Sequence, residues 1–148
     1  MTDYSELSKQ LFSLIHGVPH TVANLANASA LLYSSLDDIN WAGFYLAQGQ
    51  RLILGPFQGK TACIEIPFDR GVCGCCARTG EICLVDDVHK FPGHIACDCA
   101  SNSEIVLPIF KNGVLFGVLD IDSPVFSRFT EWDRDGLTEF VRVLENEL

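Results

Sequence analysis

One short stretch of this chain gathers side chains that can take part in redox or acid–base chemistry: within six residues it carries His94, Cys97, Asp98 and Cys99. A glycine turn opens the stretch, and the polar run 101–104 leads from it into an expected strand. Reactive side chains are often carried by loops whose ends a rigid element holds in place. We therefore expect this stretch to belong to a functional site that uses thiol chemistry.

A second strand, at 114–121, follows the first after an Asn-Gly turn. Asn-Gly between two apolar runs is a strong local signal for a β-hairpin. In such a hairpin Glu104, at the start of the first strand, lies at the same end as Asp120 and Asp122, at the end of the second. Cys97 is only a few residues upstream, so one thiol and three carboxyl groups are predicted to converge.

The composition is that of a folded, acidic protein. Of its 148 residues 48% are apolar and 20% are charged, which suits one domain with a sizeable core, predicted to span 1–148. A net charge of −9 argues against nucleic acids and anionic membranes as partners and is compatible with a ligand that carries an ammonium group. The chain has no apolar run near the ~20 residues of a membrane span and no signal-peptide pattern at its start. We expect a cytoplasmic location.

Seven cysteines are many for a chain of this length, and the number is odd. In a reducing compartment they should rest as thiols rather than as structural disulfides. Cys76 and Cys83 stand among apolar residues and are expected to pack as small hydrophobic side chains. That interpretation suits Cys97 and Cys99 poorly, because their neighbours are polar.

Apolar periodicity and turn signals predict an α+β fold, with a mainly antiparallel sheet and the terminal helices together on one face. Thr130 and Asp133 resemble a capping box at the start of the last helix, and the first helix should bury Leu7, Leu11, Leu14 and Ile15. The expected helices are 5–16, 21–36, 72–79 and one from 130 onward; the expected strands are 39–47, 51–54, 62–67, 82–85, 105–110 and 114–121, with loops at 55–59 and 86–98.

Six motifs together resemble the free methionine-(R)-sulfoxide reductases, a family of small enzymes built on a GAF domain. The motifs are INWAGFYL at 39–46, LILGPFQGKTAC at 52–63, GVCG at 71–74, DVHKFPGHIACD at 87–98, SNSEIVLPIF at 101–110 and GVLDIDSP at 117–124. Each is weak alone, whereas their combination is highly specific. The resemblance implies a single GAF domain with a six-stranded sheet, a homodimer, electrons from thioredoxin, and no bound cofactor or metal.

The same resemblance implies roles for particular residues. Cys97 corresponds to the attacking cysteine, Cys63 to the resolving one, and Cys73 to a third cysteine whose role varies among members. The substrate pocket is expected to be lined by two aromatic residues and three acids, which are Trp41, Tyr45, Glu104, Asp120 and Asp122. The chain departs from the family pattern at four further cysteines without an assigned role, which are Cys75, Cys76, Cys83 and Cys99.

The chemistry implied by these residues is a thiol cycle. Attack of Cys97 on the sulfoxide sulfur releases methionine and leaves a sulfenic acid. A second thiol, from Cys63, Cys73 or Cys99, then closes a disulfide that thioredoxin reduces. Three acids in one pocket do not all ionise readily, so one should stay protonated. We expect Glu104 on the oxygen side of the substrate, and both aspartates on the ammonium side.

Other interpretations stay open at this point. Trp41 and Tyr45 alternate in a strand and would ordinarily be core residues, and a lone His94 in a loop is more often structural or solvated. Zinc could be held by four sulfurs, those of Cys73, Cys75, Cys97 and Cys99, although their spacing fits no standard zinc motif. A GAF-type domain can also bind a small ligand without any turnover.

Overall fold

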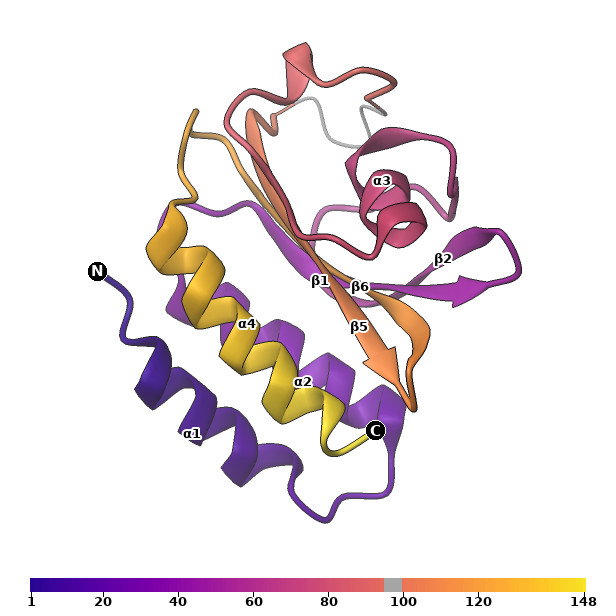
Figure 1. Cartoon of the computed structure of the whole chain (residues 1–148). Helices are drawn as coiled ribbons and strands as arrows, with labels where there is room; N and C mark the ends of the chain where they lie inside the picture. The colour runs from indigo at the N-terminus through magenta and orange to yellow at the C-terminus, as the bar shows by residue number, and fades with distance from the viewer. Residues whose placement is uncertain (95–99) are drawn as a thin grey trace.

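The computed structural model describes residues 1–94 and 100–148 of the chain. In these residues six antiparallel strands form one sheet, and α3 covers the face opposite to α1, α2 and α4 (Figure 1). The helices are α1 (Tyr4–Ile15), α2 (Thr21–Ser35), α3 (Gly71–Thr79) and α4 (Glu131–Glu145), with a short 3₁₀ helix, η1 (Val88–Lys90). The strands are β1 (Trp41–Gln48), β2 (Arg51–Gly59), β3 (Glu65–Pro67), β4 (Cys83–Val85), β5 (Ser103–Lys111) and β6 (Val114–Ser123).

The sheet has the strand order β3-β2-β1-β6-β5-β4 and separates two hydrophobic clusters. Successive side chains of a strand point to opposite faces. On β5, Ile105 and Leu107 therefore pack toward α1, α2 and α4, whereas Val106 packs in the cluster that contains α3 residues. The predicted α+β fold, with a single GAF-type sheet of six antiparallel strands, is confirmed.

The β5–β6 hairpin forms at the predicted turn. Asn112 and Gly113 both have positive φ, at 53° and 77°, as a two-residue primed turn requires. The resulting register sets Glu104 directly opposite Asp122, and Val106 opposite Asp120. The predicted convergence of these three carboxyl groups at one end of the hairpin follows from this pairing.

The expected loop at 55–59 is wrong, because β2 continues through it as far as Gly59. The pairing with β1 shifts between Gly43 and Tyr45, so the Gly-Pro dipeptide is accommodated in an irregularity of the ladder. Gly43 allows β2 to lie close to β1 at this point, since a Cβ atom on residue 43 would lie 2.2 Å from Cβ of Phe57. The expected strand at 62–67 is also shorter and begins at Glu65.

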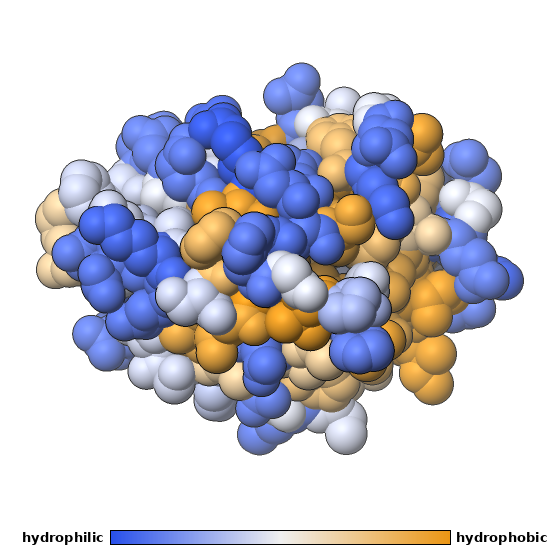
Figure 2. Space-filling view, turned by 90° about the horizontal axis from the view of Figure 1, so that it is seen from below, coloured by the Kyte–Doolittle hydropathy of each residue, from blue (hydrophilic) through white to orange (hydrophobic). Residues whose placement is uncertain are grey.

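The terminal helices pack together, as predicted, and share a buried polar contact. Asp133 completes the capping box with Thr130, and it also accepts a hydrogen bond of 2.6 Å from the hydroxyl of Tyr4 on α1. Leu14 was expected in the buried stripe of α1 but is 44% exposed. A view from below shows apolar side chains that extend from the middle of this face toward one side, with hydrophilic side chains between and around them (Figure 2).

Among the described residues, the helices are too short or too polar to cross a membrane.

Candidate functional site

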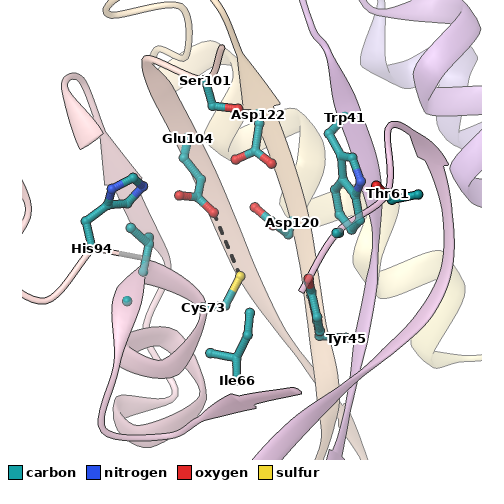
Figure 3. A pocket seen from close by; sticks show the side chains of 13 residues that line it. Trp41, Tyr45, Thr61, Ile66, Cys73, His94, Ser101, Glu104, Asp120 and Asp122 are labelled. Carbon is teal, nitrogen blue, oxygen red and sulfur yellow. Dashed lines mark hydrogen bonds between the residues drawn. The ribbon is translucent and has the colours of Figure 1, made fainter. Parts of the chain in front are cut away.

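A pocket lies between the α3 face of the sheet and the segments around it (Figure 3). Its described lining includes neither lysine nor arginine. It brings together six residues singled out from the sequence, Trp41, Tyr45, Cys73, Glu104, Asp120 and Asp122, with seven others, Thr61, Ala62, Ile66, Gly71, Val72, His94 and Ser101. Residues of β1, α3, β5 and β6, which are distant in the sequence, therefore line one pocket.

The acidic wall of the pocket comes from β5 and β6. Asp120 and Asp122 are two positions apart, so both project from the same face of β6, and Glu104 projects beside them from β5 (Figure 3). Glu104 is 7% exposed and Asp120 is 5% exposed. Within the described part of the chain, Oδ1 of Asp120 is buried without a hydrogen-bond partner. The pocket therefore offers an acceptor to a ligand that carries a donor or a positive charge.

Burial sets the protonation of these acids. The loss of hydration raises the pKa of Glu104 well above its usual value, and the neighbouring charges of Asp120 and Asp122 raise it further. Burial also raises the pKa of Asp120, although hydrogen bonds from Glu104 and Cys73 oppose that shift. Because Glu104 has the more strongly disfavoured charge, it is the acid best suited to keep a proton at neutral pH.

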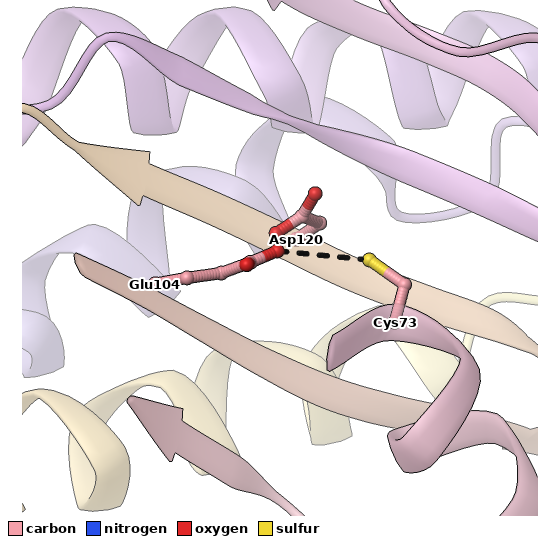
Figure 4. Close-up of side chains that lie close together, drawn as sticks. All are labelled: Cys73, Glu104 and Asp120. Atoms are coloured by element: carbon pink, nitrogen blue, oxygen red, sulfur yellow. Dashed lines mark hydrogen bonds between the residues drawn. The ribbon is translucent and has the colours of Figure 1, made fainter. Parts of the chain in front are cut away.

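Cys73 projects from the first turn of α3 toward the acids (Figure 4). Its Sγ lies 3.8 Å from Oε2 of Glu104. Burial raises the pKa of the Cys73 thiol, as do the adjacent Asp120 and Glu104. A neutral thiol is a poor nucleophile, so this setting suits Cys73 to hydrogen bonding within the pocket better than to attack.

One atom each of Cys73, Glu104 and Asp120 lies within 4.8 Å of the other two. This spacing and the negative character of the set would accommodate a cationic group, whether an ammonium or a metal ion. Of the zinc ligands considered from the sequence, Cys73 belongs to this group and Cys75 is absent from the described pocket lining; Cys97 and Cys99 lie outside the described residues.

The aromatic wall comes from β1. The rings of Trp41 and Tyr45 stack with centroids 5.9 Å apart. The Trp41 indole N–H donates to the carbonyl of Lys60 (3.1 Å), and the Tyr45 hydroxyl donates to the carbonyl of Cys63 (2.9 Å). Both residues are thus core residues and pocket residues at once, and they fix the segment that carries Cys63.

The structure describes two of the three cysteines expected to react, Cys63 and Cys73, and these two differ in oxidation state. Cys63 is disulfide-bonded, whereas the other cysteines in the described part of the chain, Cys73, Cys75, Cys76 and Cys83, are free thiols. The attacking role expected of Cys97 falls on a residue outside the described part of the chain. The described residues nearest to that gap that line the pocket are His94 and Ser101.

Sequence reasoning set His94 aside and did not single out Thr61, Ala62, Ile66 or Ser101 as pocket residues. Burial lowers the pKa of His94, and the charge of nearby His89 lowers it further, so a neutral imidazole borders the pocket. Its position three residues before Cys97 was the available signal. The others are small or apolar residues, whose types carry no chemical signature.

Comparison with known proteins shows which family has this architecture. The GAF domain model matches residues 17–148. Free methionine-R-sulfoxide reductase of Escherichia coli is 54% identical over 145 residues, which cover 98% of this chain and 88% of that protein. The chain belongs to the GAF-domain family of free methionine-R-sulfoxide reductases.

Solved structures of this family superpose closely on the chain. A structure of fRMsr of Staphylococcus aureus in complex with substrate has a TM-score of 0.95 and 50% identity, and it covers 100% of this chain and 97% of its own. Free methionine-R-sulfoxide reductase of Neisseria meningitidis, also in complex with its substrate, has a TM-score of 0.93 and 43% identity, with coverage of 97% and 87%.

Proposed function

We propose that this chain is an oxidoreductase that reduces free L-methionine-(R)-sulfoxide to L-methionine. The observation that carries the proposal is the group of three acids in a pocket whose described lining has neither lysine nor arginine. Such a pocket suits a ligand that brings its own positive charge, as the ammonium of a free amino acid does. The similarity to reductases solved with their substrates supports the same assignment.

In the proposed complex, Asp120 and Asp122 bind the substrate ammonium. The unpartnered Oδ1 of Asp120 supports this role, because an ammonium would supply the missing donor. Protonated Glu104 donates to the sulfoxide oxygen, and Trp41 and Tyr45 pack along the apolar side chain. A methionine inside a peptide lacks the ammonium, so its binding would leave the acids uncompensated.

The proposed chemistry is a thiol cycle. The Cys97 thiolate attacks the sulfoxide sulfur, and the sulfur–oxygen bond of the substrate is broken. The sulfur–sulfur bond made by this attack breaks as the oxygen passes to the Cys97 sulfur and methionine leaves. Cys97 loses two electrons to the substrate sulfur, and one proton converts the transferred oxygen to the hydroxyl of a sulfenic acid. A second thiol then attacks the sulfenic acid, so that water leaves and a disulfide forms.

Cys63 is the resolving thiol in this proposal. Its disulfide-bonded state supports that role, whereas the raised pKa of Cys73 argues against Cys73 as the resolving nucleophile. Thioredoxin, through its own dithiol, reduces the disulfide by exchange and returns both cysteines to thiols. The cycle needs no bound cofactor or metal ion.

The experiment that tests the function is single turnover of the reduced protein with each epimer of free methionine sulfoxide. We expect methionine from the R epimer alone, with two thiols lost per methionine released. N-acetylmethionine-(R)-sulfoxide, which lacks the ammonium, is the matched control and should react far more slowly. Binding of the R epimer without any methionine release would instead indicate a ligand-binding module.

We further propose that the protein acts in the cytoplasm as a homodimer. Exposed apolar side chains on the first two helices, such as Phe12 and Val22, which are 47% and 70% exposed, support association. Light scattering at micromolar concentration tests the dimer, and a mass equal to one chain would exclude it under those conditions.

A further inference from the structure

Three of the free thiols lie outside the pocket, at the contact between α3 and β4. They are Cys75, Cys76 and Cys83, and none of them belongs to the described pocket lining. Cys76 is buried, whereas Cys75 and Cys83 are partly exposed. The catalytic cycle proposed above gives these thiols no role, so their grouping calls for a separate explanation.

The chain reversal after α3 brings these thiols together. Gly80 adopts a left-handed conformation, with φ of 72°, at the C-terminal end of α3, as is common where a helix ends in a turn. The chain then doubles back, and β4 begins at Cys83. Cys83 packs against the hydrophobic cluster that contains Cys76, and its thiol donates to the carbonyl of Glu81 over 3.8 Å. The thiols of Cys76 and Cys75 are near enough to change its acidity.

Cys83 differs from its two neighbours in acidity. Hydrogen bonds from Cys76 and Cys75, with the positive charge of Arg78, lower the pKa of Cys83 to about 7, although its partial burial and Glu81 act in the opposite sense. The pKa of Cys76 is raised, first by its hydrogen bond to Cys83 and then by burial. A partly exposed thiolate next to protonated thiols is the arrangement found at oxidation-sensitive cysteines.

We propose that Cys83 is a hydroperoxide-reactive thiol that closes a reversible disulfide with one of its two α3 neighbours, Cys75 or Cys76. In the first step the Cys83 sulfur attacks a peroxide oxygen, so that a sulfur–oxygen bond forms and the oxygen–oxygen bond breaks. The sulfur loses two electrons to the peroxide, which leaves as water or an alcohol after taking up a proton. In the second step the neighbouring sulfur attacks the sulfenic acid, a sulfur–sulfur bond forms, and water leaves.

This disulfide would connect α3, which lines the pocket, to β4, which pairs with the pocket strand β5. Cys76 lies one helical turn after Cys73, and β4 pairs with β5 so that Val85 stands opposite Glu104. The crosslink itself stays outside the pocket, and sulfoxide reduction by the untreated protein does not depend on it. The thiol group is thus a second oxidation site, independent of the proposed catalytic cysteines.

The test is to treat the fully reduced, full-length protein with one equivalent of hydrogen peroxide, block the remaining thiols and map the peptides by mass spectrometry. We expect a crosslink between Cys83 and Cys75 or Cys76 that dithiothreitol removes. Cys83→Ser should abolish the crosslink while sulfoxide turnover without peroxide stays unchanged. Cys73→Ser, a control from the same helix, should keep the crosslink.

A second measurement on the unmodified protein avoids any dependence on variants. The rate of Cys83 alkylation by iodoacetamide, followed against pH, should rise with a midpoint near 7, below that of an ordinary thiol. Peroxide that leaves Cys83 unmodified, or that oxidises it to a sulfinic acid without a crosslink, would overturn the proposal. An ordinary thiol midpoint would overturn it as well, whatever the outcome of the turnover assay.

Discussion

Sγ of Cys73 lies 3.8 Å from Oε2 of Glu104, although the two residues stand 31 positions apart in the chain. The thiol comes from the first turn of α3 and the acid from the start of β5, so their contact joins the helix to the sheet across the pocket (Figure 4). Burial raises the pKa of the Cys73 thiol, and the charges of Asp120 and Glu104 raise it further.

Cys73 should therefore be slow to react with thiol reagents in the folded, reduced protein. Each unit by which the pKa is raised lowers the thiolate fraction about tenfold at neutral pH. A time course of iodoacetamide labelling at pH 7, read peptide by peptide, should show Cys73 modified well after Cys83. Equal labelling rates in the folded protein would contradict this, whereas equal rates in denaturant are expected.

Glu104→Gln should stabilise the ligand-free protein at high pH relative to the unmodified chain. The pKa of Glu104 is raised from 4.5 on folding, so above that pH the unfolded state releases a proton that the folded state keeps. The free energy of unfolding then falls as pH rises from 4.5 toward the folded pKa, by about 1.4 kcal/mol per unit. Thermal unfolding of both proteins at pH 5 and pH 8 measures this; a variant without advantage at pH 8 would refute it.

Asp120→Asn should raise KM for free methionine-(R)-sulfoxide about 10- to 100-fold, because a hydrogen bond to a charged group contributes roughly 1.5–3 kcal/mol. The variant keeps the shape of the side chain but offers a neutral amide to the ammonium. Steady-state kinetics provide the measurement. Asp135→Asn, which removes an exposed carboxylate from α4, is the matched control and should leave KM unchanged.

Tyr45→Phe should slow disulfide formation more than it slows methionine release. The lost hydroxyl donates to the carbonyl of Cys63 over 2.9 Å, so its removal loosens the segment that carries the resolving thiol. Rapid quenching of a single turnover, with thiols and methionine counted separately, resolves the two steps. Trp41→Phe, which removes the donor to Lys60, should act in the same direction. Thiol loss that keeps pace with methionine release in both variants would rule out this positioning role.

Tyr4→Phe should destabilise the protein by about 1–2 kcal/mol, because it removes a buried hydrogen bond of 2.6 Å to Asp133. This corresponds to a Tm lower by roughly 2–8 °C for a domain of this size. Differential scanning calorimetry gives the value. Tyr33→Phe alters a hydroxyl on a side chain that is 40% exposed and should change Tm far less; equal effects of the two changes would argue against the α1–α4 contact.

Local signals in the sequence were sufficient for much of the fold. The Asn112-Gly113 dipeptide permits the primed turn that fixes the hairpin, and the period-2 alternation of β5 and β6 then sets Glu104 beside Asp122. The capping box of Thr130 and Asp133 supplies hydrogen bonds to backbone N–H groups at the start of α4, and it needs only residues close in the chain. Because each of these features depends on residues close in the chain or on one short connection, the sequence predicts them directly.

Other features depended on the tertiary structure. The sequence at 55–59 contains Gly-Pro and predicts a loop, whereas the missing Cβ of Gly43 on the adjacent strand allows β2 to continue past it. The closeness of Cys73 to Glu104, and the grouping of Cys83 with Cys76, require α3 to pack on one particular face of the sheet. Residue types determined which groups could react, but their pKa values depend on burial and on neighbours distant in the chain, which only packing determines.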